Sequence, residues 1–344
     1  MSNTNDAWSS NTTLAEIAAW LKTCRVVVLV THVKPDGDAV GSTIGVARAL
    51  ARLKINAVPW YVGPMPDWLP AVANPTKHRV IDAHGLPPEA PDGVLVLDTG
   101  SWTQLHDVAD WLRERHGITA VIDHHAHGEP DVAPRRWIES DCASVCQPAA
   151  ELCRLLLGKP RLDDLPRDVA EPLYLGVATD TGWFRHSNVS PRVFRDAASL
   201  LAAGADHPRL YEAIEQQNRA SRLALMARAL ASLEMLRDGR AAVMTLTLQD
   251  FHDSRAAPTD SGGFVDLPLT VTGVMVSVVI TEAFTGPHGT NVTKISIRSK
   301  EAANAIDANA LAQKLGGGGH IRAAGAKMPV TLAEAKKRVY EVLP

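Results

Sequence analysis

Four apolar stretches of this chain end in carboxylate or imidazole side chains, and no other feature restricts the fold as strongly. The stretches cover residues 25–32, 94–98, 120–125 and 175–180, and two more aspartates, Asp36 and Asp38, follow the first of them. Apolar runs of this length are typical of strands buried in a parallel sheet. The carboxyl ends of such strands meet at one edge, where open α/β sheets bind their ligands. We therefore expect these side chains to form a metal site at that edge.

Helical periodicity between the predicted strands indicates an α/β fold. Over residues 41–54, apolar side chains recur at helical spacing, at Ile44, Ala47, Leu50 and Leu53. Predicted strands at 94–98, 118–122 and 174–179 alternate with predicted helices near 104–116, 143–157 and 191–203. This alternation predicts a doubly wound parallel sheet in a first domain, residues 14–205.

The sequence changes character near residue 206. Residues 206–237 are rich in Ala, Leu and Arg and predict a helical linker. Beyond it, residues 238–344 predict a smaller α/β domain with a mixed sheet. The expected elements are strands at 241–248, 274–283, 291–299 and 323–328, a turn at 286–289, a helix at 305–315, a loop at 316–320, and a last helix opened by a capping box at Thr331–Glu334.

Composition excludes several classes of protein. A chain of 344 residues with 46% hydrophobic residues is long enough for two domains, and it has no apolar run of membrane-spanning length. The polar first thirteen residues lack a signal core, so we expect a cytoplasmic protein, in which four cysteines suit a reducing compartment as free thiols. A net charge of −3 argues against a broad grip on long duplex DNA and favours a small anionic substrate.

The types of side chain at the predicted edge favour particular metals. Carboxylate oxygens and imidazoles without thiolates suit Mn²⁺ or Mg²⁺, with Co²⁺ or Fe²⁺ as alternatives, better than structural Zn²⁺. Asp36 and Asp38 can reach two neighbouring ions, with Asp98 bridging them and His124 and Asp180 completing the second. Such a pair of ions can hold a shared hydroxide and polarise a phosphoryl oxygen.

Each of these residues also has a simpler interpretation. A single aspartate after a strand is usually a helix cap or a turn residue. The coincidence at four predicted strand ends favours the metal site instead. Asp123 is expected to orient the neighbouring histidines, and His127 is taken as an exposed loop residue.

Two features of the second domain predict anion binding. The glycines of residues 316–319, followed by His320, would let backbone N–H groups close on an anion, although a flexible hinge is the alternative. Arg298, in an otherwise alternating strand, suggests phosphate recognition, with a surface-edge arginine as the alternative.

The motifs together resemble those of a known family. The segments His32-Val-Lys-Pro-Asp-Gly-Asp38, Asp98, Asp123-His-His125 and Asp180-Thr-Gly-Trp-Phe184 match the four motifs of DHH phosphoesterases in order. The segments Arg298-Ser-Lys300 and 316–325 match the associated C-terminal domain. The chain is most similar to the bifunctional oligoribonuclease/pAp phosphatase (nano-RNase) branch, from which it departs at Thr31 and in the less acidic segment 261–266.

The resemblance implies roles for individual residues. His32, Asp36 and Asp98 would hold one Mn²⁺, and Asp38, Asp98, His124 and Asp180 the other. His125, with Asp123, would serve catalysis by contacting the scissile phosphate. The second domain would hold substrate through Arg298, Ser299, Gly317, Gly318, Gly319 and His320.

The implied activity is hydrolysis of short RNAs of two to five nucleotides, dinucleotides such as pApA, and 3′-phosphoadenosine 5′-phosphate. Within enzymes, the alternatives are a RecJ-like single-strand exonuclease, which normally carries an extra module, and a cyclic or linear dinucleotide phosphodiesterase. An inactive RNA-binding or regulatory module is a third, disfavoured because every expected ligand is present. The spacing of Gly37, Gly41 and Gly45 argues against a nicotinamide-binding fold. The motifs do not determine the oligomeric state, and a homodimer is one of the states they allow.

Overall fold

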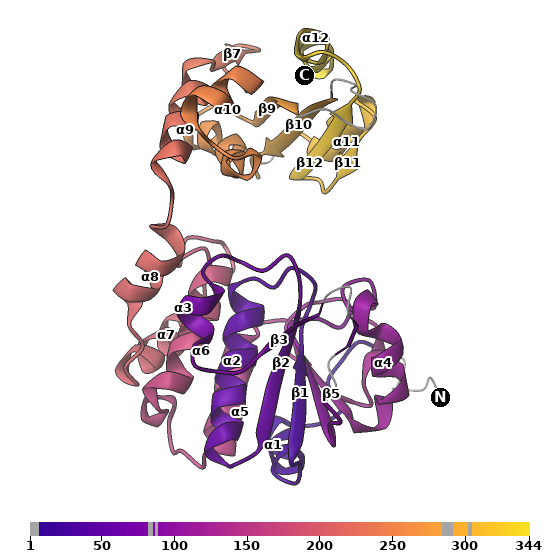
Figure 1. The fold of residues 1–344 in the computed structure, drawn as a ribbon, viewed down its shortest axis with the longest axis vertical. Helices are drawn as coiled ribbons and strands as arrows, with labels where there is room; N and C mark the ends of the chain where they lie inside the picture. Colours follow the sequence, from indigo (N-terminus) through magenta and orange to yellow (C-terminus); the bar gives the residue numbers. More distant parts are fainter. Residues whose placement is uncertain (1–6, 82–84, 87–88, 284–291, 302–304) are drawn as a thin grey trace. The chain divides into compact units, whose positions relative to one another are not determined.

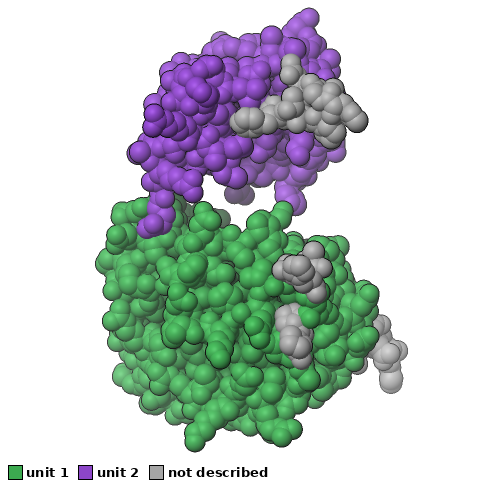
Figure 2. Space-filling model, in the orientation of Figure 1, with its two compact units in different colours: residues 1–216 green, residues 217–344 purple. Residues whose placement is uncertain are grey.

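The computed structural model describes residues 7–81, 85–86, 89–283, 292–301 and 305–344. The chain forms two compact units, residues 1–216 and 217–344 (Figure 2). Each unit is considered by itself. None of the helices in the described ranges combines the length and the apolar character needed to cross a bilayer.

The first unit is built on a parallel sheet of six strands. These are β1 (Val26–Val30), β2 (Asn56–Val62), β3 (Arg79–Ile81), β4 (Gly93–Leu97), β5 (Thr119–Asp123) and β6 (Arg135–Ile138). Their order is β3-β2-β1-β4-β5-β6, so the chain starts in the middle and proceeds outward in both directions. The predicted doubly wound sheet is confirmed. Its direction changes between β1 and β4, where such sheets bind ligands at the carboxyl ends of their strands.

Helices cover both faces of this sheet (Figure 1). They are α1 (Leu14–Leu21), α2 (Gly37–Arg52), α3 (Leu69–Ala73), α4 (Ala109–Glu114), α5 (Cys146–Leu156), α6 (Arg167–Asp180), α7 (Pro191–Ala202) and α8 (His207–Glu215), with 3-10 turns at His106–Val108, His116–Ile118, Pro130–Val132 and Leu162–Asp164. The larger apolar core lies between the sheet and α1, α2, α5 and α6, and a smaller one lies beneath α4. Strands buried on both faces explain the continuous apolar runs in the sequence.

The fourth predicted strand is wrong. Residues 174–179 belong to helix α6, which packs against α2, α5 and α7. Every residue from Leu173 to Ala178 is buried. A helix buried on all sides has no polar face, so its sequence has the same continuous apolar run as a buried strand. Asp180 therefore reaches the ligand-binding edge from the end of a helix.

Glycines allow α2 and α6 to approach each other closely. A Cβ atom on Gly41 would lie 2.3 Å from the carbonyl oxygen of Pro172, and one on Gly37 would lie 2.2 Å from Oγ1 of Thr179. On the facing helix, a Cβ on Gly176 would lie 2.7 Å from Oδ1 of Asp38. Distances this short leave no room for a side chain. The regular spacing of these glycines thus reflects helix packing.

The second unit contains a mixed sheet with helices on both faces. Its strands are β7 (Glu234–Leu236), β8 (Ala241–Leu246), β9 (Val276–Ala283), β10 (Val292–Ser299), β11 (Gly318–Gly319) and β12 (Ala323–Met328), in the order β11-β12-β10-β9-β8-β7. Its helices are α9 (Ala220–Ala231), α10 (Leu248–Ser254), α11 (Ala308–Lys314) and α12 (Leu332–Val342), with 3-10 turns at Pro258–Ser261 and Phe264–Thr270. Strands β8 and β9 are parallel and the other neighbours antiparallel, so the predicted mixed sheet is confirmed.

The segment expected to be a helical linker is divided in the structure. Helix α8 ends at Glu215 in the first unit, α9 begins at Ala220 in the second, and residues 234–236 are strand β7. The predicted loop at 316–320 contains the short strand β11. The predicted turn at 286–289 lies outside the described residues.

Candidate metal centre

The polar side chains predicted to meet at the sheet edge do so. All of them except the buried Asp38 and Asp123 line a cavity of about 370 Å³ at the carboxyl ends of β1, β4 and β5. Its lining comprises His32, Asp36, Asp98, His124, His125 and Asp180, together with Thr99, Gly100, Ser101, Thr103, Gln104 and His127.

One group of possible ligands surrounds the end of β1. Nε2 of His32 lies 3.7 Å from Oδ1 of Asp36 and 3.3 Å from Oδ2 of Asp98. Asp36 is the N-cap of α2, where its Oδ1 accepts hydrogen bonds from the backbone N–H groups of Asp38 and Ala39. His32, Asp36 and Asp98 together offer ligand atoms close enough to hold one metal ion.

A second group surrounds His124, which follows β5. Its Nε2 lies 3.7 Å from Oδ2 of Asp38, 3.4 Å from Oδ1 of Asp98 and 3.8 Å from Oδ2 of Asp180. Asp38, His124 and Asp180 also have the spacing of a metal-binding group. Asp180 stands at the carboxyl end of α6, where the helix dipole favours a cation.

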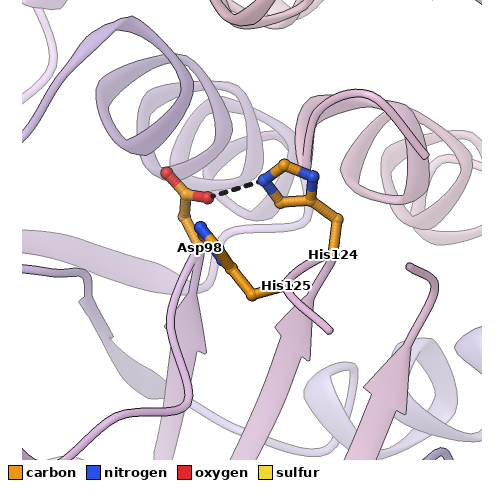
Figure 3. Close-up of side chains that lie close together, drawn as sticks. All are labelled: Asp98, His124 and His125. Atoms are coloured by element: carbon orange, nitrogen blue, oxygen red, sulfur yellow. Dashed lines mark ion pairs between the residues drawn. The ribbon is translucent and has the colours of Figure 1, made fainter. Parts of the chain in front are cut away.

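Asp98 lies between the two groups. One carboxylate oxygen faces His32 and the other faces His124; Figure 3 shows the second contact. The residue directly follows β4 and has a φ of 68°, in the left-handed region that aspartate tolerates better than most side chains. Its backbone N–H donates to the carbonyl of Ile122 on β5. The main chain thus turns the carboxylate into the space between neighbouring strands.

Asp38 is held by the N-terminus of a second helix. It lies in the first turn of α2, which begins before the helical periodicity noted at residues 41–54, and it is 1% exposed. Its Oδ1 accepts hydrogen bonds from Oγ of Ser144 and the N–H of Cys146, and its Oδ2 accepts one from the N–H of Val145. This network fixes the carboxylate where α5 begins.

Both histidines facing Asp98 present Nε2 to the carboxylates. Their Nδ1 atoms lie 2.9 Å and 3.2 Å from backbone carbonyl oxygens, of Val33 for His32 and Cys142 for His124. A carbonyl can only accept, so each Nδ1 carries the proton that it donates there. In the neutral ring this leaves the lone pair on Nε2, which is the arrangement of a metal-binding histidine.

The charges at this site are poorly compensated without a cation. Burial, reinforced by Asp98 and Asp180, raises the pKa of Asp38 to about 8. Burial also raises the pKa of Asp180 to about 6, against the opposing effect of His124. Burial alone would lower the pKa of His124, but the neighbouring carboxylates outweigh it and raise that pKa to about 10. The cluster therefore retains protons that a divalent cation would replace.

Asp123 forms hydrogen bonds with the two histidines that follow it. Its Oδ1 accepts hydrogen bonds from the N–H groups of His124 and His125 and lies 2.7 Å from Nδ1 of His125. This carboxylate raises the pKa of His125 and thus favours the charged ring. The His125 side chain is 53% exposed and reaches the cavity.

In the second unit, three of the predicted substrate-binding residues lie around one end of β12. Arg298 pairs with Ala323 across the sheet, and the N–H of His320 donates to the carbonyl of Ala323. Nε of Arg298 lies 3.6 Å from Oδ1 of Asp266, within the segment that departs from the family pattern. Ser299 is buried, and its Oγ donates to the carbonyl of Ile321.

The glycine-rich segment differs from the anion-binding loop that the sequence suggested. The N–H groups of Gly316, Gly317, Gly319 and His320 already donate to acceptors within the unit. A Cβ on Gly317 would lie 2.1 Å from the carbonyl oxygen of Gly325, and one on Gly319 would lie 2.6 Å from that of Ala323. These glycines therefore permit close packing of β11 on β12.

Sequence reasoning missed part of the cavity wall. His127, expected to be a simple loop residue, is exposed and lines the cavity, and Ser101, Thr103 and Gln104 join it from the loop after β4. Only their proximity to the motifs in sequence could have indicated this.

Comparisons with known proteins agree with the motifs. A model of the DHH family N-terminal domain matches residues 26–177, and a model of the DHHA1 domain matches residues 238–343. The bifunctional oligoribonuclease and PAP phosphatase NrnA of Thermus thermophilus is 32% identical over 319 residues, which cover 92% of this chain and 89% of that protein. The cyclic-di-AMP phosphodiesterase PdeA of Listeria monocytogenes is 27% identical over 332 residues, covering 92% of this chain and 47% of PdeA.

A solved structure extends the likeness to the fold. The crystal structure of an exopolyphosphatase-related protein from Bacteroides fragilis aligns with a TM-score of 0.78 and 25% identity, covering 96% of this chain and 94% of that one. The resemblance inferred from the motifs is confirmed: the chain belongs to the DHH family of phosphoesterases and carries a DHHA1 domain.

Proposed function

We propose that this protein is a Mn²⁺-dependent phosphoesterase that hydrolyses short oligoribonucleotides, 3′-phosphoadenosine 5′-phosphate, or both. The observation that carries the proposal is the position of Asp98, whose two oxygens face the histidines of two neighbouring ligand groups. A bridging carboxylate between two such groups suits a pair of divalent ions. The proposed ligands are His32, Asp36 and Asp98 for one ion, and Asp38, Asp98, His124 and Asp180 for the other.

The donor set fits these ions. It contains four carboxylates and two imidazoles with Nε2 facing inward, and no thiolate contributes, because the nearby Cys146 is buried with a pKa well above its ordinary value. Oxygen and imidazole ligands suit Mn²⁺ and Mg²⁺. When bound, the ions would supply an activated water molecule and positive charge for phosphoryl oxygens.

The chain's own residues would orient the substrate. His125, kept in one orientation by Asp123, would donate a hydrogen bond from Nε2 to a phosphate oxygen, and its raised pKa favours the charged form that does so best. The neighbouring polar wall at Ser101, Thr103, Gln104 and His127 would exclude large apolar groups from the site.

The names of the relatives support the choice of substrate. Two NrnA proteins, of Thermus thermophilus and Bacillus subtilis, are similar to this chain over nearly its whole length. In the second unit, Arg298, Ser299 and His320 would hold the nucleotide, with the Arg298 guanidinium as the main phosphate contact. The glycines at 317–319 would contribute by leaving room for the nucleotide to approach the backbone closely, because most of their N–H groups already have acceptors.

The test compares Asp98→Ala and His124→Ala with the wild-type protein. Each variant is offered labelled RNAs of graded length, pApA, 3′-phosphoadenosine 5′-phosphate and cyclic di-AMP, with Mn²⁺ present. Both should lose hydrolysis of every substrate, while Asp92→Ala should retain it, because Asp92 accepts backbone hydrogen bonds from Arg25 and Val26 at the opposite edge of the sheet. Turnover by Asp98→Ala would refute the bridging role, and a preference for cyclic di-AMP would assign the activity suggested by PdeA.

A further inference from the structure

The segment before α1 lies along the open edge of the sheet. Oγ of Ser10 bonds both the N–H and the carbonyl of Ile138 on β6, and the N–H of Asn11 donates to the carbonyl of Arg136. The Asn11 side chain accepts a hydrogen bond from the N–H of Arg136. Because β6 is the last strand of the sheet, residues 10–12 occupy backbone groups that would otherwise be exposed.

Trp8, just before these residues, is wedged between two loops of the metal centre. A Cβ on Gly100 would lie 1.8 Å from Cη2 of the indole, and one on Gly128 would lie 2.5 Å from its Cε2. The ring therefore fills the space that side chains at these two positions would need. Its Nε1–H donates a hydrogen bond of 3.0 Å to the backbone carbonyl of His125.

The two loops carry most of the site. Gly100 belongs to the loop that begins with Asp98 after β4, and Gly128 belongs to the loop of His124 and His125 after β5. The loops are also joined directly, by the N–H of Glu129 donating to the carbonyl of Gly100. Trp8 is thus a packing element shared by both.

The backbone of His125 is held from both sides. Its N–H donates to Oδ1 of Asp123, and its carbonyl accepts from Trp8. The exposed imidazole has one hydrogen bond, also to Asp123, within the described part of the chain. The position of the ring in the cavity therefore depends on the main chain that carries it.

We propose that Trp8 is a positioning residue for the reaction, which sets the place of His125 through the wedge between Gly100 and Gly128. Its effect on turnover rests on the proposed function, whereas its effect on the loops does not. A shift of about 1 Å in a group that contacts the reacting phosphate can lower the rate on the order of 100-fold. We expect Trp8→Ala to lower kcat about 10- to 100-fold with a smaller change in KM.

The experiment is a double-mutant cycle between Trp8 and Gly100. In the wild-type background, Gly100→Ala should displace the indole and lower kcat as much as Trp8→Ala does. Once Trp8 is alanine, the added methyl group has space, so the double variant should be no worse than either single variant. Trp8→Phe keeps an aromatic ring but removes the N–H donor, and should fall between wild type and Trp8→Ala.

Trp20→Ala is the matched control. Trp20 packs against Gly93, at the other end of β4, where a Cβ would lie 3.3 Å from its Cζ2. Its loss should lower the melting temperature and leave kcat unchanged. Hydrogen exchange measured by mass spectrometry supplies a readout independent of activity: Trp8→Ala should raise exchange in residues 99–104 and 125–131, and Trp20→Ala should not.

The outcomes separate this inference from the proposed function. Two results would overturn the wedge. One is unchanged hydrogen exchange in both loops of Trp8→Ala. The other is a fold-decrease in kcat of the double variant that equals the product of the two single-variant decreases. If wild-type protein hydrolyses none of the substrates, the proposed function fails, and the exchange data alone then decide for or against the wedge.

Discussion

Replacing Asp180 by asparagine should stabilise the metal-free protein while weakening its metal site. Asp180 stands at the end of α6, close to His124 and the other carboxylates, and burial raises its pKa from the ordinary 3.8 to about 6. The folded protein therefore prefers the protonated carboxyl. The resulting stability is fully present below pH 3.8 and is lost as the pH rises through about 6.

The size of the effect on stability follows from this shift in the pKa of Asp180. At about 1.36 kcal/mol per pH unit, the ionised Asp180 costs up to about 3 kcal/mol at pH 8. This value is an upper bound, because 30% of the side chain is exposed to solvent and His124 partly compensates the charge. An asparagine side chain does not ionise, so the Asp180→Asn variant should gain up to about 3 kcal/mol at pH 8 and about half as much at pH 5.

Tryptophan fluorescence provides a selective assay. All eight tryptophans lie within residues 1–216, so urea unfolding followed by their emission reports on the first unit alone. The measurement is made in EDTA at pH 5 and pH 8, and again with Mn²⁺. A ligand at 100 times its dissociation constant stabilises a protein by about 2.7 kcal/mol, a gain that Asp180→Asn should largely lose.

Two results would contradict this reasoning. If Asp180→Asn is no more stable than wild type at pH 8 in EDTA, the ionised Asp180 carboxylate does not destabilise the folded protein. If Mn²⁺ stabilises both proteins equally, Asp180 is not a ligand.

Three further predictions concern packing and substrate. Gly41→Ala should destabilise the first unit by about 1–3 kcal/mol, because its methyl group would meet the carbonyl of Pro172; a wild-type urea midpoint would contradict the close helix contact. Arg48→Met should cost about 2–4 kcal/mol in the same assay, since the half-buried guanidinium donates to the carbonyls of Val72 and Asn74 and to Oγ1 of Thr76; a loss below about 1 kcal/mol would mean that water replaces these bonds. Arg298→Ala should mainly raise KM for nucleotide substrates, and steady-state kinetics with an unchanged KM would remove Arg298 from the binding set.

The sequence predicts the candidate metal centre because the side chains gathered there follow local rules. Asp98 and His124 come directly after strands whose apolar runs are unmistakable, and parallel strands bring such positions to one edge. Asp180 lies at the expected edge of the sheet, but it ends a helix and not the strand that the sequence predicted. A buried helix and a buried strand share the same continuous apolar pattern, and only the packing of α6 against α2 distinguishes them.

Features that depend on distant contacts could not be predicted. The wedge of Trp8 joins residues more than ninety positions apart, and nothing near Trp8 in the sequence indicates its partners. The glycines at 317 and 319 suggested an anion-binding loop, because glycine permits both open backbone and close packing. Which of the two applies depends on β12, whose carbonyls leave no room for a Cβ.

The contact between α2 and α6 has a consequence for how the site could adapt to different ions. Asp38 and Asp180 are carried by helices that approach closely at Gly37, Gly41 and Gly176, where the nearest atoms belong to the short side chains of Thr179, Cys146 and Asp38 or to the backbone of Pro172. Small changes of side-chain rotamer at this contact could not accommodate an ion of different radius, because the two helices would have to move apart as rigid bodies. The ionic radius that the site prefers would then be set mainly by the distance between the two helices. Substitutions of the proposed ligand side chains would change the affinity for metal more readily than they would change which ionic radius is preferred.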